Sequence, residues 1–463
     1  MRTIFITRTL GQQPEIFLMK KILLLGAGQS ASTLIEYLLN ISEAKNWELA
    51  IGDADEALAQ KKGKGIARGF AFNVTNEVQL GVEIEKADLV ISMLPARFHT
   101  LVANECLKQS RHLVTASYVN DEMRTLHEEA EKKDLVFLNE CGLDPGIDHM
   151  SAMKSIDKIR DGGNELIGFE TFTGGLLAPS EEENPWKYKF TWNPRNVVLA
   201  GQGIVKFIQE GRYKFIPYHR LFRRTEIVHI PKYGEFEGYA NRDSLKYLDV
   251  YNLRGIRTLY RGTFRRPGFS KAWDVFVQLG ATDDTYKMEG VDKMTHRQFI
   301  NSFLFYNPDD SIELKLAHYL NLDMEGEIMY KLKWMGVFSE ELVGLKEGTP
   351  AQILEAILRK KWTLTKEDRD MIVMWHKFTY LDKANDNRET EIHATLVTIG
   401  EDTVNTAMSK SVGLPLGIAA KLILEGKVEA RGVLIPTIKE LYNPIMTELE
   451  TYGFDFNESC MLK

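Results

Sequence analysis

The feature that most constrains the fold is a regular alternation of short apolar runs and helical stretches in the first third of the chain. The apolar runs read as strands buried on both faces of a parallel sheet: Ile22–Leu25, Glu48–Gly52, Ala87–Leu94, His112–Ala116 and Leu135–Leu138. Helical stretches fall between them, near residues 54–62, 97–109 and 120–133. The alternation predicts a doubly wound α/β domain over residues 19–145.

The pattern changes after residue 145. Runs of β-branched and aromatic residues predict strands of a mixed sheet at Ile167–Thr173, Thr225–Ile230, Gly255–Thr263 and Thr390–Thr398. Helical periodicity dominates between them, at Lys271–Leu279, Arg297–Phe303, Ile312–Leu320, Gly326–Met335, Pro350–Lys361 and Lys366–Phe378, and again at 404–425 and 437–452. We expect a mixed α/β domain at 146–267 and 385–430, an inserted helical subdomain at 268–384, and a C-terminal helix within 431–463 that returns toward the first domain.

Composition narrows the class of protein. A net charge of −7 argues against sequence-independent binding of nucleic acid. Cys106, Cys141 and Cys460 form no CxxC pair and the ten histidines show no HExxH spacing, so we expect a reducing, cytoplasmic location and no metal site. The most apolar stretch, Val412–Leu424, is too short to cross a membrane. Residues 1–18 precede a second methionine and are expected to be an extension outside the fold.

The turn after the first strand carries a dinucleotide-binding fingerprint, Gly26-x-Gly28-x-x-Ala31, with Gln29 and Ser30 inside it. Gly26 permits a tight turn, Gly28 lets backbone N–H groups approach a pyrophosphate, and the small Ala31 lets helix and strand pack closely. The alternative is a glycine turn without a ligand. The strand before it and the helix after it favour the coenzyme site.

Asp53 ends the second strand, where a carboxylate accepts hydrogen bonds from the ribose hydroxyls of NAD and repels a 2′-phosphate. Ala54 and Asp55 stand where an NADP site would carry arginine. We therefore expect NAD in preference to NADP. The alternative is that Asp53 only caps the following helix.

Asp144-Pro145-Gly146 places a rigid turn soon after a buried strand, at the edge where doubly wound sheets bind ligands. Ser117 and Tyr118 follow the preceding strand and are expected at the same edge. The alternatives are that Asp144 only forms the turn and that Tyr118 only packs.

Six short stretches, spread in order along the chain, resemble one enzyme family. They are Thr115–Tyr118 (TASY), Gly142–His149 (GLDPGIDH), Gly174-Gly175, Asn184–Trp192 (NPWKYKFTW), Asn241–Ser244 (NRDS) and Arg261–Thr263. On these motifs the chain resembles the L-glutamate-forming saccharopine dehydrogenase family, also called saccharopine reductase, over nearly all of 20–463. GLDPGIDH and NRDS are far more specific than a glycine fingerprint.

The resemblance implies a Rossmann-like domain, a mixed α/β substrate and dimer domain with a helical part, and a homodimer. It implies that two segments line both coenzyme and substrate: Ala116, Ser117 and Tyr118, and Leu143, Asp144 and Pro145. It places Asn241, Arg242 and Asp243 on saccharopine, Phe72, Asn73 and Val74 near the adenine, and Leu94 and Pro95 near the ribose. Where relatives often carry Cys-Gly-Gly this chain has Thr173-Gly174-Gly175, so a cysteine is not an essential acid or base here.

The implied reaction interconverts saccharopine with L-glutamate and L-2-aminoadipate 6-semialdehyde in lysine metabolism. Saccharopine has three carboxylates, which call for cations, and Arg242 is the first candidate and Arg261 the weaker one. Tyr118 and Asp144 are the candidates for proton transfer. Two alternatives stay open at this stage: a carboxynorspermidine-type dehydrogenase and a non-catalytic dinucleotide-binding sensor.

Overall fold

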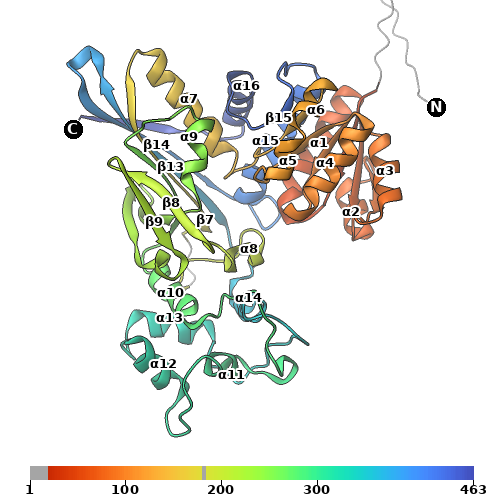
Figure 1. The fold of residues 1–463 in the computed structure, drawn as a ribbon. Helices are drawn as coiled ribbons and strands as arrows, with labels where there is room; N and C mark the ends of the chain where they lie inside the picture. Colours follow the sequence, from red (N-terminus) through yellow and green to blue (C-terminus); the bar gives the residue numbers. More distant parts are fainter. Residues whose placement is uncertain (1–18, 180–183, 463) are drawn as a thin grey trace, which may run out of the picture. The chain divides into compact units, whose positions relative to one another are not determined.

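The computed structural model describes residues 19–179 and 184–462 (Figure 1). The expected extension at 1–18 lies outside these residues. Contacts divide the chain into a first unit, residues 1–157 and 407–455, and a second unit, residues 158–406 and 456–463. Each unit has its own β-sheet.

The sheet of the first unit is parallel throughout, which confirms the predicted doubly wound fold. Its strands among the described residues are β1 (Lys21–Leu25), β2 (Glu48–Asp53), β3 (Arg68–Ala71), β4 (Leu89–Ser92), β5 (His112–Thr115), β6 (Val136–Leu138) and β15 (Gly432–Leu434). Their spatial order is β15-β6-β5-β4-β1-β2-β3, and each neighbouring pair is parallel. The central strands β1, β4 and β5 are almost wholly buried, as their continuous apolar runs require.

Helices connect these strands. They are α1 (Ser32–Lys45), α2 (Glu56–Gly63), α3 (Glu77–Glu85), α4 (His99–Gln109), α5 (Asp121–Thr125) and α6 (His127–Lys132). Helix α7 (Ile147–Asp161) follows β6 and leads into the second unit. Asp55, Asn76 and Asn120 cap α2, α3 and α5, each accepting a hydrogen bond from a backbone N–H in the first turn. Two short 3-10 turns, η1 (Gln29–Ala31) and η2 (Ala96–Phe98), precede α1 and α4.

Helix α15 (Ala407–Leu424) corrects the predicted domain boundary, because it belongs to the first unit and not to the second domain, where 385–430 was placed. Gly413 and Gly417 let it lie directly on α1: a Cβ atom on Gly413 would lie 2.7 Å from the backbone nitrogen of Leu34. By length and composition α15 could cross a membrane, but 83% of it is buried in the protein, as in any core helix. Helix α16 (Lys439–Glu450) also lies in the first unit.

The second unit contains the predicted mixed sheet. Its main path is β10 (Thr225–Ile230), β11 (Gly234–Ala240), β12 (Thr258–Arg265), β7 (Glu165–Leu177), β13 (Asp370–Asp382), β14 (Arg388–Ile399) and β16 (Asn457–Leu462). β12 and β7 are parallel and the other pairs on this path are antiparallel. A hairpin of β8 (Ile204–Gln209) and β9 (Arg212–Pro217) joins the sheet through β12.

Strand β13 corrects the prediction of a helix at Lys366–Phe378. The run from Asp370 contains apolar residues at nearly every position, so it satisfies a helical period as well as a strand period. In the structure it pairs with β7 and β14 along its length and is buried over most of it. The helical part therefore ends at residue 362.

The other predicted helices of this region are confirmed as α10 (Phe269–Leu279), α11 (His296–Asn301), α12 (Ile312–Leu320), α13 (Glu327–Met335) and α14 (Pro350–Trp362). Thr295 and Thr349 begin α11 and α14 with capping boxes completed by Gln298 and Gln352. Figure 1 shows α11, α12 and α13 gathered at one end of the second unit, and α14 beside α8. Two short helices, α8 (Pro194–Val198) and α9 (Tyr247–Val250), complete the unit.

Candidate active site

The glycine loop has the geometry that the fingerprint predicts. Gly26 has a φ of 101°, and a Cβ atom there would lie 3.0 Å from the carbonyl oxygen of Met93, so only glycine fits without strain. A Cβ atom on Gly28 would meet nothing within 4 Å, so the space beside it is open. The loop precedes η1 and α1, whose first N–H groups can receive an anion. These features fit the pyrophosphate of a dinucleotide.

Asp53 holds the loop from the end of β2. Its carboxylate accepts a hydrogen bond from the Ala27 backbone N–H at 2.6 Å and a second from the Asp55 N–H at 2.9 Å. The cap of α2 is Asp55, which accepts from the Leu58 N–H at 3.0 Å. Asp55 therefore caps α2, which was the alternative role for Asp53. Asp53 instead bonds to the glycine loop.

Apart from Leu143, Asp144 and Pro145, which come after β6, the remaining predicted coenzyme residues follow the carboxyl ends of three further strands. Asn73 and Val74 follow β3, and Leu94 and Pro95 follow β4 just before η2. Ala116 and Ser117 follow β5. Because all these strands are parallel, their carboxyl ends form one edge of the sheet, and the first unit brings the predicted coenzyme residues to that edge.

The two predicted catalytic side chains meet. The hydroxyl of Tyr118 donates a hydrogen bond to the Asp144 carboxylate at 3.1 Å. Backbone bonds join their segments, from the Glu140 N–H to the Ser117 carbonyl at 3.1 Å and from the Cys141 N–H to the Thr115 carbonyl at 3.2 Å. The bend contains a cis peptide between Asp144 and Pro145.

Small residues allow this close approach. A Cβ atom on Gly142 would lie 2.9 Å from the Cβ atom of Ala116, and one on Gly146, at a φ of 147°, would lie 2.0 Å from the Gly142 carbonyl oxygen. Leu143 and Pro145 complete the same bend, in which the Gly142 N–H bonds the Pro145 carbonyl at 2.9 Å. The glycines of GLDPGIDH are thus required by packing at the bend.

A buried histidine that the sequence did not predict supports Ser117. His99, 4% exposed, lies within 2.9 Å of the Ser92 hydroxyl through Nδ1 and within 2.7 Å of the Ser117 hydroxyl through Nε2. Burial lowers the pKa of His99 to about 4, so the ring is neutral near pH 7. It joins Ser92 at the end of β4 to Ser117, which follows β5. Its position at the start of α4 gave no signal in the sequence.

A second buried group supports the other side of the same segment. The Glu140 carboxylate accepts a hydrogen bond from the Val119 N–H at 3.0 Å and lies 2.9 Å from Nε2 of His149. Asp148 lies 3.6 Å from Nδ1 of His149 and accepts a bond from the Gly146 N–H at 2.6 Å. Glu140, Asp148 and His149 are at most 2% exposed. Tyr118 is thus held between a residue bonded to His99 and a residue bonded to Glu140.

The predicted substrate residues Asn241, Arg242 and Asp243 lie in the second unit, after β11. Asp243 caps a 3-10 turn by accepting from the Leu245 N–H at 3.0 Å, and its carboxylate lies 3.4 Å from Nζ of Lys206. Arg242 has a φ of 52°, and its carbonyl accepts from the Lys206 N–H at 3.1 Å. The described contacts of Asp243 are therefore to Leu245 and Lys206.

Known proteins resemble the chain over both units. The family model described as "Saccharopine dehydrogenase NADP binding domain" matches residues 22–138, and "Saccharopine dehydrogenase C-terminal domain" matches residues 142–454. The chain belongs to the saccharopine dehydrogenase family. Saccharopine dehydrogenase [NADP(+), L-glutamate-forming] of Schizosaccharomyces pombe is 32% identical over 96% of this chain and 99% of its own length.

Two other comparisons extend this membership. Mitochondrial alpha-aminoadipic semialdehyde synthase of Rattus norvegicus is 32% identical over 96% of this chain, and the chain spans 48%, about half, of that relative's length. The apo structure of saccharopine dehydrogenase (L-Glu forming) from Saccharomyces cerevisiae superposes with a TM-score of 0.85 at 29% identity, covering 96% of this chain and all of that one. The predicted family and fold class are confirmed. The first unit contains the family's NADP-binding domain, although no arginine follows Asp53.

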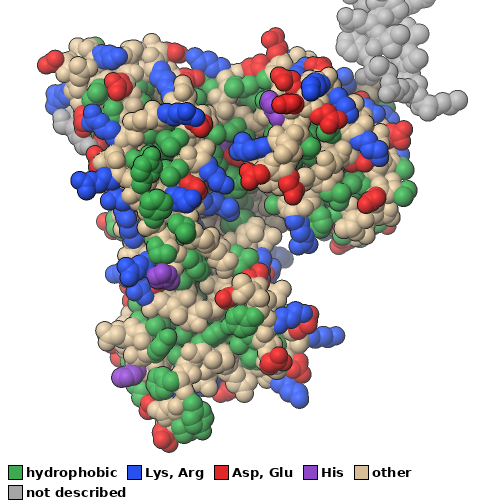
Figure 2. Space-filling model, viewed as in Figure 1, with side chains coloured by type: hydrophobic (Ala, Val, Ile, Leu, Met, Phe, Trp, Pro, Cys, Tyr) green, Lys and Arg blue, Asp and Glu red, His purple; other side chains and the backbone are tan. Residues whose placement is uncertain are grey.

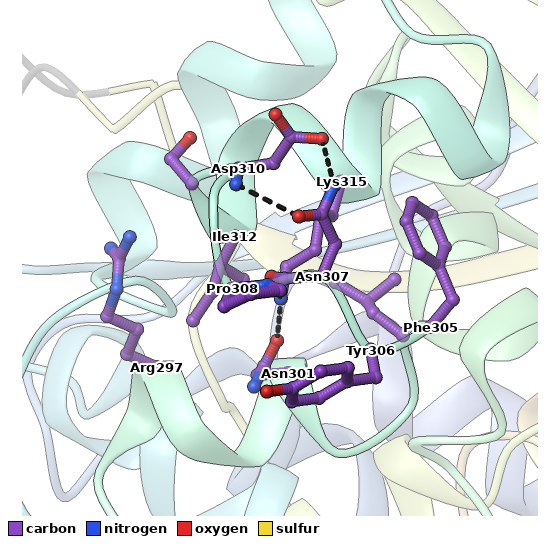
Figure 3. A pocket seen from close by; sticks show the side chains of 11 residues that line it. Arg297, Asn301, Phe305, Tyr306, Asn307, Pro308, Asp310, Ile312 and Lys315 are labelled. Carbon is purple, nitrogen blue, oxygen red and sulfur yellow. Dashed lines mark hydrogen bonds between the residues drawn. The ribbon is translucent and has the colours of Figure 1, made fainter.

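A pocket of about 400 Å³ lies apart from these residues, in the helical part of the second unit (Figure 3). Arg297, Asn301, Tyr306 and Lys315 are among its lining side chains. Lys315 donates to the Asn301 side-chain oxygen at 2.5 Å, and Arg297 forms two hydrogen bonds with Glu313. None of the predicted site residues of this saccharopine dehydrogenase family member lines the pocket.

Proposed function

We propose that the protein is an oxidoreductase that interconverts saccharopine with L-glutamate and L-2-aminoadipate 6-semialdehyde, in lysine metabolism. The observation that carries the proposal is the 3.1 Å hydrogen bond between Tyr118 and Asp144 at the carboxyl edge of a parallel sheet that also holds the glycine loop. Relatives that match the chain along almost their whole length are named for this reaction.

The oxidative direction needs two proton steps at the substrate. The secondary amine must lose its proton before hydride leaves the adjacent carbon, and water must then be activated to hydrolyse the resulting imine. A bound nicotinamide coenzyme supplies the hydride acceptor. Asp144 is the acceptor for the proton, and Tyr118, which donates to Asp144, orients the carboxylate and can relay the proton.

The coenzyme proposed is NAD in preference to NADP. Gly26, Gly28 and Ala31 would accommodate the pyrophosphate, and the carboxylate of Asp53 would accept bonds from the ribose hydroxyls. The carboxylate lies 2.6 Å from the Ala27 N–H, close to the loop, where a 2′-phosphate would meet a like charge. The fungal relatives are named for NADP(+), so this preference distinguishes the chain from them.

The substrate's three carboxylates need cations, and Arg242 is proposed as one of them, with Asn241 and Asp243 beside it. The left-handed backbone at Arg242 sets this residue at a sharp turn after β11. A guanidinium can bind a carboxylate through two parallel hydrogen bonds.

Steady-state kinetics test the function directly. Saccharopine should drive formation of reduced nicotinamide, followed by its absorbance, with a higher kcat/KM for NAD⁺ than for NADP⁺. Turnover of carboxynorspermidine but not of saccharopine would show that the protein is a carboxynorspermidine-type dehydrogenase instead. Binding of coenzyme with turnover of neither would indicate a dinucleotide-binding sensor.

The proposal includes a homodimer. Apolar side chains on β8, β9 and β10 of the second unit are exposed by more than half: Ile204, Tyr213, Phe215 and Ile227. Figure 2 shows hydrophobic side chains gathered on the part of this unit where Figure 1 places β8 and β9. Such a surface is typical of an interface between copies. Light scattering after size-exclusion chromatography should give twice the 52.9 kDa chain mass.

The proposed location is cytoplasmic, in agreement with three cysteines that are all free thiols. Fractionation of cells that express the protein would test it.

A further inference from the structure

Lys62, the second-last residue of α2, reaches back to the glycine loop. Its ammonium group donates to the carbonyl oxygen of Gly28 at 2.8 Å and to the hydroxyl of Ser32 at 2.9 Å. The side chain is partly buried between α2 and the start of α1. A cation from a neighbouring helix thus lies beside the second glycine of the fingerprint.

The hydrogen-bond partners of this ammonium group are uncharged. Gly28 and Ser32 contribute uncharged oxygens, and no carboxylate of the described chain lies within ion-pair distance of Lys62. Burial lowers the pKa of Lys62, and the charge of Asp53 opposes that change. A partly desolvated ammonium group without a bound anion is unfavourable, and a negatively charged ligand would relieve this.

The space next to it suits such a ligand. An added Cβ on Gly28 would meet no atom within 4 Å, so the side of the loop away from the strand is open. The backbone N–H groups that follow open α1, where phosphate groups bind in dinucleotide folds. Ala54 and Asp55 provide no other cation after β2.

We propose that Lys62 binds a phosphate group of the dinucleotide coenzyme, releasing its bond to Gly28 or Ser32 to do so. This inference rests on the proposed function, since it requires that the first unit binds a nicotinamide coenzyme. The ammonium group of Lys62 could bind either of two phosphate groups: the pyrophosphate that NAD and NADP share, or the 2′-phosphate of NADP. Both are anions that an ammonium group recognises as a point charge.

Fluorescence titration of the purified full chain with NADH and with NADPH measures this without turnover. Lys62→Met removes the charge and keeps most of the apolar stem, and Lys61→Met is the matched control, because Lys61 is an exposed lysine on the same helix. Lys62→Met should raise the Kd about tenfold or more relative to Lys61→Met, as expected for loss of a charged hydrogen bond. Lys62→Arg should retain most of the affinity.

Each result decides a point. Equal weakening of NADH and NADPH identifies the pyrophosphate, and weakening of NADPH alone identifies the 2′-phosphate. Unchanged affinity in Lys62→Met, with normal binding by the wild type, overturns the inference and leaves the proposed function intact. An equal loss in Lys62→Arg and Lys62→Met overturns the role of charge. A wild type that binds neither coenzyme contradicts the proposed function itself.

Discussion

The two ends of the carboxyl edge in the first unit are built differently. At the glycine-loop end, formed by Gly26–Ala31 with Asp53 and Lys62, the two charged side chains are partly exposed and bond mainly to the backbone. At the bend end, formed by Thr115–Val119 and Asn139–His149 with His99, buried side chains bond to one another as well as to the backbone.

This difference fits the function that we propose for each end. A pyrophosphate can be held by backbone N–H groups and a few surface charges, so the loop needs space and a tight turn. Proton transfer needs two side chains at a fixed separation, and buried supports prevent them from rotating apart. We therefore expect substitutions at the bend end to affect turnover and stability, and those at the glycine-loop end to affect coenzyme affinity.

The largest effect is expected at the bend end. Asp144→Asn removes the proposed proton acceptor and leaves an oxygen that can still accept a hydrogen bond from Tyr118. Turnover should fall at least ~100-fold, while circular dichroism and NADH affinity stay close to the wild type. Near-normal turnover would mean that Asp144 only forms the turn. It would contradict the expectation that substitutions at the bend end affect turnover.

Glu140→Gln tests the support behind Tyr118. The amide can still accept from the Val119 N–H, but the buried charge beside His149 is lost. Urea unfolding should show a loss of about 2 kcal/mol, as expected for a buried charged hydrogen bond. If turnover falls while NADH affinity is kept, Glu140 positions the catalytic segment. Unchanged stability and turnover would show that the buried pair does not hold the bend.

His99 gives the bend end a pH dependence. Its pKa is lowered to about 4 in the folded protein, against about 6.5 when unfolded. Between pH about 4 and about 6.5, His99 is therefore protonated in the unfolded chain but not in the folded protein. The free energy of unfolding thus falls as the pH drops through this range. The contribution is at most about 1.4 kcal/mol per pH unit. Urea unfolding at several pH values should show a smaller slope for His99→Gln than for the wild type, and equal slopes would contradict it.

Asp53→Ala sharpens the comparison from the glycine-loop end, with the smallest expected effect. Loss of the carboxylate should weaken NADH several-fold to about tenfold and reduce the preference over NADPH, because one charged acceptor is lost. The free energy of unfolding should fall by only about 1 kcal/mol, because the Ala27 N–H loses its acceptor. A large loss of turnover at saturating coenzyme would mean that this end also governs the chemistry.

The sequence predicts the glycine-loop end better than the bend end for a physical reason. Gly26 and Gly28 act through local backbone geometry, which a strand–turn–helix pattern already contains, and Asp53 ends the second strand at the distance that the dinucleotide fingerprint expects. His99 and Glu140 act through contacts with Ser117 and Val119, which are 18 and 21 residues away in the chain. Such contacts depend on which strands are neighbours in the sheet, and a local sequence pattern does not predict strand pairing.

The same limit explains the two errors in the fold. The apolar run in β13 fits either period, and its place in the centre of a sheet is decided by β7 and β14. The helical periodicity at 404–425 predicts a helix but not its partner α1, which Gly413 and Gly417 allow to pack closely against it.

The order of the strands along the chain has a consequence for biosynthesis. β15 covers an outer edge of the first sheet by pairing with β6, and β16 does the same in the second sheet by pairing with β14. Both strands come after residue 430, so a nascent chain on the ribosome carries two uncovered sheet edges until translation has passed them. Uncovered edges are sites of intermolecular pairing. A premature stop codon near residue 430 would leave the bend at Gly142–His149 encoded but yield a product prone to aggregate.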